Sequence, residues 1–309
     1  MNAMQAEIAL RAIKTVATND GATDLTGFHR GAIAAFQSHI SASAFDVDAL
    51  ATISPDELAL AIPDVETRNV AIYDLAYAAM IDPDLVGDES RMELVERFAA
   101  ALEVRPSILK ALRHAVRQQR VFLQIDALRM FLATLDAKGW TDKLRQLWNA
   151  VAPFLGVTDA AKAARYRALE AMPRGTLGRT YYEFVTSRNL PFPGEKHGAP
   201  EHYFVPHDLV HCLAGYGTDR DGEVQIIGFE AGYRKRGGLD VILLALCQVQ
   251  LGMVIDPVAP ALRGELDFDK LLAAYRRGSQ IAIDFSDSWD YWAVFDRPID
   301  ELRARYELA

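Results

Sequence analysis

Apolar residues recur along residues 1–118 with the three- and four-residue spacing of amphipathic helices, and no stretch there shows the alternation typical of a half-buried strand. The helical pattern then continues in three further segments: Val121–Leu135, Thr141–Leu155 and Asp159–Met172. At 309 residues the chain is long for a single domain. We therefore predict an all-α fold of two packed helical domains, residues 1–118 and residues 119–309.

The apolar pattern of the first domain repeats at an offset of 62 residues. At this offset, an acidic turn and the apolar positions around it in the first copy correspond to similar residues in the second: Ala17 with Ala79, Asp20 with Asp82, Ile33 with Val95, Phe36 with Phe98 and Ile40 with Leu102. This part resembles the TerB-like tellurite-resistance domain, an all-helical fold with an acidic turn before each of two related helices. The acidic side chains of the turns either bind a cation or cap the following helices, and we favour capping: Asp20, Asp24, Asp82, Asp84 and Asp88.

The most apolar segment is Asp240–Ile255, which we predict to be a central buried helix. It falls short of the roughly 20 residues that span a bilayer, and Gln248 and Gln250 interrupt it. Aromatic residues crowd a later segment, where core packing is expected and membrane contact is the alternative: Trp289, Tyr291, Trp292 and Phe295.

The composition and the charge of the chain argue against a disordered protein and against a nucleic-acid-binding protein. Half of the residues are apolar, so the chain can bury a sizeable core and is not expected to be disordered. In residues 1–118, 10 basic and 17 acidic residues give a net charge of −7, and in residues 119–309, 23 and 25 give −2. Nucleic-acid binding calls for a basic face, so no nucleic-acid partner is expected.

Cys212 and Cys247 are the only cysteines, too few for a disulfide scaffold or a thiolate zinc cluster. We therefore predict a reducing, cytoplasmic environment and expect Cys212 to be a buried apolar residue. The stretch from Met1 to Leu10 has neither a basic head nor a long apolar run, so no secretory signal is expected.

His207 and His211 are four residues apart, so on a helix both imidazoles lie on one face, with Asp208 on the same side. Pro206 suits the first position of that helix. Glycines at 215, 217 and 222 allow the chain to double back, so a returning helix brings Glu223 to the same point. Two imidazoles and two carboxylates from two helices predict a site for a divalent metal ion.

Two other interpretations of the histidines stay open. Histidines at positions i and i+4 are often partly buried side chains that hydrogen-bond carbonyl groups. An adjacent His-Asp pair also occurs in phosphohydrolases, which need another histidine well upstream on a separate helix. His197 and His202 are too close to the pair to fill that role comfortably.

The pattern H-D-x-x-H-x11-E resembles the signature of the coenzyme Q biosynthesis protein 4 family. The residues that carry it are His207, Asp208, His211 and Glu223. Two further segments match that family in the same order: Gly175-Thr176-Leu177-Gly178 with Tyr181 and Phe184, and Glu301-Leu302-Arg303 with Tyr306. The resemblance covers roughly residues 119 to 309.

This resemblance implies an all-helical protein of ubiquinone biosynthesis that decarboxylates a prenylated aromatic ring with the help of a metal ion. The expected ligands are His207, Asp208, His211 and Glu223, with zinc as the expected metal and iron or manganese as alternatives. Glu230 lies two turns beyond Glu223, so we expect it to support a ligand from behind.

The chain departs from the family just before the His-Asp pair. Family members have arginines there, whereas this chain reads Glu201-His202-Tyr203-Phe204-Val205-Pro206. Basic residues after the helix of Glu223 are weak candidates for contact with a substrate or another anion: Arg234, Lys235 and Arg236. A non-catalytic carrier of a prenyl lipid, or a scaffold for quinone-biosynthesis enzymes, is therefore the alternative function.

The expected partners follow from these two functions. They are a prenylated quinone precursor or another isoprenoid lipid, and other proteins of quinone biosynthesis. A homodimer is left open. Because such lipids reside in membranes, a peripheral position of the protein at the inner face of a membrane is the alternative to a purely cytoplasmic one.

Overall fold

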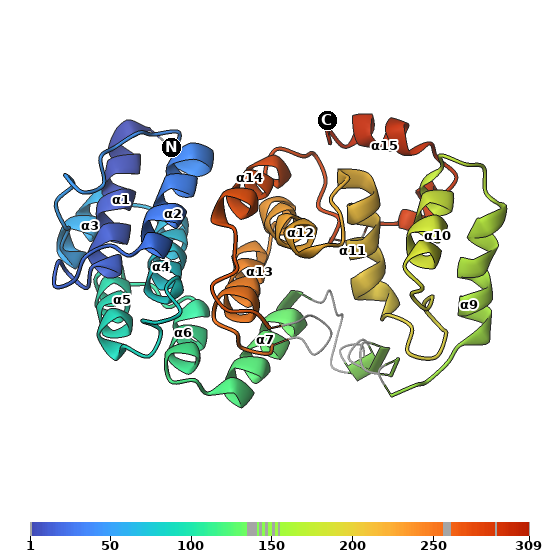
Figure 1. Cartoon of the computed structure of the whole chain (residues 1–309), viewed down its shortest axis with the longest axis horizontal. Helices are drawn as coiled ribbons and strands as arrows, with labels where there is room; N and C mark the ends of the chain where they lie inside the picture. The colour runs from blue at the N-terminus through green and yellow to red at the C-terminus, as the bar shows by residue number, and fades with distance from the viewer. Residues whose placement is uncertain are drawn as a thin grey trace. The chain divides into compact units, whose positions relative to one another are not determined.

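The computed structural model describes residues 2–134, 155–255, 261–287 and 289–308, with positions 141, 144–145, 148–149 and 152–153 between them. Within these residues the fold is all-α, with 14 helices and no strand (Figure 1). Within the predicted segment Thr141–Leu155, positions 142–143, 146–147, 150–151 and 154 lie outside the described residues. Among the described helices, none is both long and apolar enough to cross a membrane.

The chain forms two compact units, each of which combines two stretches of sequence. Unit 1 contains Met1–Met130 and Gly237–Arg276, and unit 2 contains Phe131–Arg236 and Arg277–Ala309. This grouping differs from the continuous division after residue 118 that we expected, because the segment from Gly237 packs with the N-terminal helices. One such contact is a buried hydrogen bond of 2.7 Å from the Gln250 amide to the carbonyl oxygen of Ile81.

Unit 1 is built on a repeated pair of helices. Its helices are α1 (Ala3–Ala17), α2 (Gly27–Phe36), α3 (Pro55–Ala61), α4 (Val65–Met80), α5 (Glu89–Ala101), α6 (Ile108–Val116) and α7 (Arg120–Thr134), which runs past Met130. The pairs α1–α2 and α4–α5 start 62 residues apart, at residues 3 and 65 and at residues 27 and 89. Phe36 and Phe98, which the repeat pairs, are both buried. The sequence repeat is therefore a structural repeat.

The acidic turns of the repeat stabilise local backbone. Asp88 is the N-cap of α5, and its carboxylate accepts from the Ser90 amide at 3.0 Å and from Arg91 at 2.8 Å. The Asp82 carboxylate accepts from the amide of Asp84 at 2.9 Å. Among the described residues, these aspartates form no group that resembles a metal site. The geometry supports the capping interpretation for Asp88, whereas the N-cap of α2 is Thr26 rather than Asp24.

The apolar segment that starts at Asp240 completes unit 1. It forms α13 (Gly238–Ala245) and a π-helical turn over Leu246–Gln250, followed by α14 (Phe268–Gly278), which runs past Arg276. Leu243, Leu246 and Cys247 are fully buried. The buried helix is present but ends at Gln250, five residues before the predicted end, and Gly252 follows with a left-handed φ of +67° that takes the chain out of the helix.

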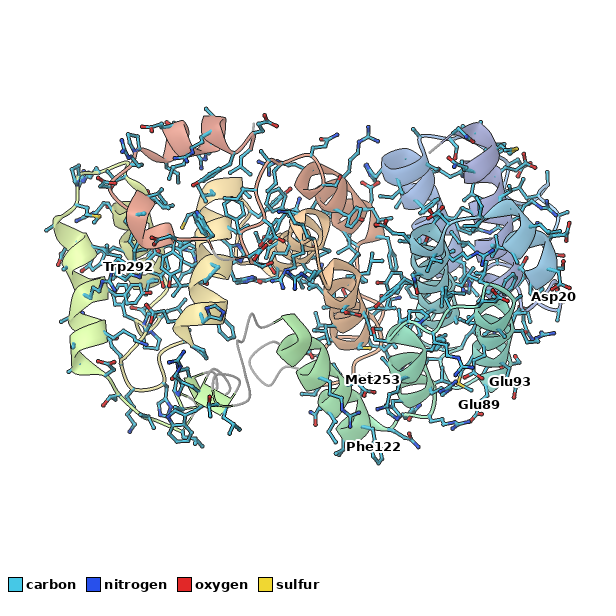
Figure 2. All side chains as sticks on the ribbon, turned by 180° about the vertical axis from the view of Figure 1, so that it is seen from behind. Asp20, Glu89, Glu93, Phe122, Met253 and Trp292 are labelled. Atoms are coloured by element: carbon cyan, nitrogen blue, oxygen red, sulfur yellow. The ribbon has the colours of Figure 1, made fainter. Side chains whose placement is uncertain are left out.

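Unit 2 carries the histidine motif. Its described helices are α9 (Ala160–Arg167), α10 (Leu177–Ser187), α11 (Glu201–Ala214), α12 (Arg220–Tyr233) and α15 (Ile299–Arg305). Aromatic side chains form much of its core. The ring of Trp292, labelled in Figure 2, lies 4.9 Å from that of Tyr166 and 4.8 Å from that of Phe295, measured between centroids. These contacts are those of core packing.

Candidate metal centre

The helix that carries His207 and His211 begins earlier than the sequence indicated. α11 starts at Glu201, directly after Pro200, and Pro206 lies inside it rather than at its first position. Glu201 is held by the Tyr166 hydroxyl at 2.7 Å and by Lys162 at 2.8 Å, which stabilises this first turn. Because proline has no N–H, the helix lacks one backbone hydrogen bond at Pro206.

Cationic side chains hold the C-terminal end of α11. The helix ends at Ala214, and the C-cap residue Gly215 follows with a φ of +80°, which suits glycine. Arg303 donates to the carbonyl oxygens of Cys212 and Leu213 at 3.1 and 3.0 Å, and Arg277 donates to that of Ala214 at 2.9 Å. These arginines satisfy carbonyl groups that have no partner within the helix and complement its dipole. They thereby fix the turn that carries His211.

A tight turn brings the next helix back to the histidines. Asp219 is the N-cap of α12 and accepts from the Gly222 amide at 3.0 Å. A Cβ atom on Gly222 would lie 2.1 Å from the Gly217 carbonyl oxygen, so only glycine allows this close turn. Glu223 consequently lies in the first turn of α12 and faces α11.

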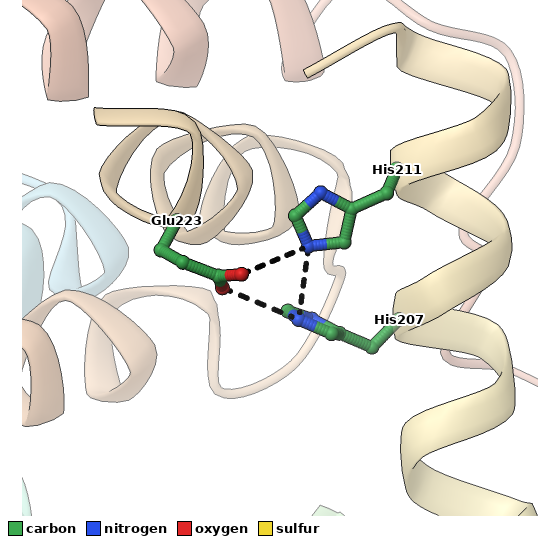
Figure 3. Close-up of side chains that lie close together, drawn as sticks. All are labelled: His207, His211 and Glu223. Atoms are coloured by element: carbon green, nitrogen blue, oxygen red, sulfur yellow. Dashed lines mark hydrogen bonds and ion pairs between the residues drawn. The ribbon is translucent and has the colours of Figure 1, made fainter. Parts of the chain in front are cut away.

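Three ligand-type side chains converge between α11 and α12 (Figure 3). The Nε2 atoms of His207 and His211 lie 3.3 Å apart. The Glu223 carboxylate oxygens lie 3.7 Å from Nε2 of His207 and 3.6 Å from Nε2 of His211. The His211 side chain is buried, whereas that of Glu223 is 43% exposed, so the group is accessible from the glutamate side.

The other ring nitrogen of each histidine faces a hydrogen-bond acceptor. Nδ1 of His207 lies 2.8 Å from Glu230 Oε1, and Nδ1 of His211 lies 3.2 Å from the Tyr216 carbonyl oxygen. Each acceptor requires a proton on Nδ1, so in the neutral rings the Nε2 lone pairs point at each other and at Glu223. The His211 ring also stacks on Phe184, with centroids 5.7 Å apart.

The charges of the group reinforce this arrangement. Burial by itself would lower the pKa of His207, but the carboxylates of Glu230 and Glu223 raise it well above 6.5. Burial would raise the pKa of both glutamates, yet the imidazoles lower that of Glu223 to about 2, and Arg234 and His207 lower that of Glu230 to about 2. Both carboxylates are therefore charged at neutral pH.

Two nitrogen lone pairs and a carboxylate repel one another at these distances. A positive charge between them removes this repulsion. A proton on Nε2 of one imidazole provides this charge in the metal-free protein, which agrees with the raised pKa of His207. A divalent cation bound to both Nε2 atoms and Glu223 provides it equally well and matches the preferred ligands of zinc. Histidine ligands that donate Nδ1–H to a carboxylate or a carbonyl oxygen are typical of metal sites.

Asp208 does not join the three converging side chains. Among the described residues the group contains His207, His211 and Glu223 only. Asp208 is about 100° further round the helix than His207, and its electrostatic neighbours include Arg188. Burial raises the pKa of Asp208 to about 6. The structure thus brings together three of the four predicted ligands and places the fourth beside them.

Glu230 contacts His207 on the side of the ring away from His211 and Glu223, and Arg234 in turn contacts Glu230. Nη2 of Arg234 is 2.7 Å from Glu230 Oε2, and the side chains of both residues are largely buried. The backbone amide of Lys235 donates to Asp284 at 2.9 Å. Of the basic stretch Arg234, Lys235 and Arg236, the first therefore supports the histidine site through Glu230.

The flanking motif residues support the site helix. Thr176 is the N-cap of α10, and Tyr181 and Phe184 are buried. A Cβ atom on Gly178 would lie 2.5 Å from Met172 Sδ and 3.1 Å from the Phe295 carbonyl oxygen, so this glycine allows close packing. Sequence reasoning missed the roles of the Tyr216 carbonyl group and of Arg277, because neither backbone acceptors nor distant capping contacts leave a spacing signal.

Comparisons of this sequence with models of known protein families and with curated proteins found no match. The chemistry of the centre therefore rests on the convergence of His207, His211 and Glu223.

Proposed function

We propose that His207, His211 and Glu223 bind one divalent metal ion, with zinc as the expected ion, and that the chain acts in the biosynthesis of a ubiquinone-type quinone. The observation that carries the metal site is the 3.3 Å approach of two Nε2 atoms whose Nδ1 partners are acceptors. Three protein ligands leave a coordination position for water or substrate, which is the usual plan of catalytic zinc sites.

The proposed reaction is the decarboxylation of a prenylated aromatic acid, which the motif resemblance implies. A divalent ion would supply a positive charge that binds a ring carboxylate or phenolate and stabilises negative charge as the carbon–carbon bond breaks. Glu230 and the Tyr216 carbonyl group hold the two imidazoles in position for this ion. Zinc keeps one oxidation state, so any accompanying oxidation needs molecular oxygen or another oxidant.

A non-catalytic prenyl-lipid carrier or scaffold is the second candidate, and the residues before the motif favour it. Where the resembled family has arginines, this chain has Glu201, which is bound to Lys162 and Tyr166. Arg234 contacts Glu230. The chain therefore offers fewer cationic groups for a substrate carboxylate next to the site than the resemblance implies.

A turnover assay separates the two functions. Purified, metal-loaded protein is given a prenylated hydroxybenzoate whose carboxyl group is intact, and released CO₂ is measured beside ligand binding. Release of CO₂ that is lost in Glu223→Ala supports the enzyme. Tight binding without CO₂ supports the carrier. A protein that neither binds nor converts the compound contradicts both functions and leaves the metal site to be tested separately.

A further inference from the structure

Unit 1 contains an apolar cavity of about 160 Å³. Its wall comes from α1, α2 and α4 on one side and from the segment 239–275 on the other. Apart from His29 and Asp74, the side chains that line it are apolar or aromatic, among them Ile33, Phe36, Val70, Ile242, Leu246 and Leu271. The metal-motif residues do not contribute to this wall.

Hydrogen bonds from α4 hold the two sides of the wall together. The Tyr77 hydroxyl donates to the Leu239 carbonyl oxygen at 2.6 Å, and the Tyr73 hydroxyl donates to Asp240 at 2.7 Å. These polar groups satisfy one another, so what faces the cavity is largely hydrocarbon. A cavity of this kind is preformed and does not hold ordered water well, because water needs several polar partners.

Four lining residues carry a polar group: His29, Asp74, Tyr77 and Tyr275. The first two differ in what they offer a ligand. Both ring nitrogens of His29 are engaged, Nδ1 with Thr26 Oγ1 at 2.9 Å and Nε2 with the Ala78 carbonyl oxygen at 3.1 Å. The Asp74 carboxyl group makes no hydrogen bond to another described residue, and burial raises its pKa to about 7. At neutral pH this group therefore carries a proton in a large share of molecules and is able to donate it in a hydrogen bond.

Size, access and charge define the ligand. An apolar cavity of about 150 Å³ is large enough for a benzene-sized group. The Val70 side chain lines the cavity and is 41% exposed, which marks an opening to solvent. No Lys or Arg is among the described residues of the wall, so an anionic head group would find no compensating charge.

We propose that this cavity binds the end of an uncharged lipid that carries a hydroxyl or carbonyl group, with Asp74 as the hydrogen-bond partner of that group and the adjoining hydrocarbon against the apolar wall. The lipid chain is either isoprenoid or unbranched, and both share the required chemistry. The inference does not depend on the metal site or on the reaction proposed for it.

Calorimetric titration of the intact 309-residue chain with farnesol, 1-dodecanol and dodecanoate tests the ligand class. At least one alcohol should bind, and dodecanoate should bind at least about tenfold more weakly, since a buried charge without a partner is costly. Tighter binding of farnesol would assign an isoprenoid ligand, and tighter binding of dodecanol an unbranched one. Failure of both alcohols to bind, or equal affinity for dodecanoate, would overturn the proposal.

Variants locate the bound alcohol. Val70→Trp at the opening and Ala32→Leu in the wall should each weaken binding by about tenfold or more, and Asp74→Leu by about tenfold through one lost hydrogen bond. Leu60→Trp is the matched control, because Leu60 is 88% exposed and does not line the cavity. Circular dichroism shows which variants fold. Undiminished binding in folded Val70→Trp and Ala32→Leu would place the ligand elsewhere and overturn the assignment.

Discussion

The proton on Nδ1 of each histidine governs what the centre can bind. Glu230 and the Tyr216 carbonyl oxygen accept these protons, so both Nε2 lone pairs are directed at the same point as the Glu223 carboxylate. Without the acceptor at Glu230, the His207 ring is free to adopt the other tautomer or to rotate. The strength of His207 as a ligand would therefore depend on Glu230, a residue that would not itself contact the proposed ion.

We predict that Glu230→Gln weakens metal affinity by about 10–100-fold while metal binding is retained. The substitution keeps the shape of the side chain and removes the charge that accepts from His207 and Arg234. Competition with a chelator of known affinity measures the change. Glu223→Gln is the comparison and should reduce affinity further, because it changes a ligand. Equal affinity in wild type and Glu230→Gln would contradict the supporting role.

The metal-free protein should lose stability as pH rises above 6.5. The folded-state pKa of His207 is raised, so its contribution is complete below the unfolded value of 6.5 and is lost as pH rises through the folded value. The depressed pKa values of Glu223 and Glu230 act in the opposite sense, since their contribution is lost as pH falls from 4.5 to about 2. The contributions of His207, Glu223 and Glu230 to the stability of the metal-free protein are thus all present between about pH 4.5 and 6.5.

Metal should reduce the alkaline loss, because a bound ion takes the place of the His207 proton. Thermal melting at pH 6 and pH 9, with and without one equivalent of zinc, measures this difference. If the melting temperature falls equally from pH 6 to pH 9 with and without zinc, no ion replaces the His207 proton.

At the scale of helices, the site depends on how α10, α11 and α12 are held. Arg303 and Arg277 hold the end of α11, and the Gly222 turn brings α12 back to it. Gly178 brings α10 close to Phe295, with the Gly178 amide donating to the Phe295 carbonyl oxygen at 2.8 Å. Most of the motif residues around the histidines therefore pack the helices together or cap their ends.

Gly178→Ala should destabilise the protein by about 1–3 kcal/mol, because the added methyl group overpacks a close contact. The matched control is Gly31→Ala on α2, where an added Cβ meets nothing within 4 Å. That substitution should be neutral or stabilise by up to about 1 kcal/mol. Urea unfolding of both variants measures the free energies, and equal effects would contradict the packing role of Gly178.

Helical spacing predicts much of this centre but not all of it. The four-residue spacing of His207 and His211 places them on one face, and the seven-residue spacing of Glu223 and Glu230 places both carboxylates toward α11. Spacing alone does not show whether Asp208 is a ligand or only a neighbour of the ligands. The orientation of α12 decides which carboxylate faces the imidazoles. Pro206 indicated a helix start, yet Pro200 and the contacts of Glu201 begin the helix earlier.

At the scale of the whole chain, the repeat was visible in the sequence and the grouping of segments was not. Apolar positions at an offset of 62 residues correspond to the helix pairs α1–α2 and α4–α5. The membership of Gly237–Arg276 in unit 1 depends on long-range contacts such as that of Gln250 with Ile81. A local pattern of apolar residues contains no information about such partners.

Metal binding should protect unit 2 selectively. An ion that links α11 to α12 slows local opening of these helices, whereas none of its ligands lies in unit 1. Hydrogen exchange with and without zinc should show slower exchange in residues 201–233 and little change in residues 3–101. Protection confined to unit 1 would contradict the placement of the site.

The central claim is that His207, His211 and Glu223 bind one divalent ion, and elemental analysis tests it most directly. The protein is purified without chelator as wild type, His211→Ala, Glu223→Ala and His202→Ala, the last being an exposed histidine on the same helix. We predict about one ion per chain, zinc as the expected element, in wild type and His202→Ala, and a severe loss in the other two. Full metal content in both His211→Ala and Glu223→Ala would contradict the account.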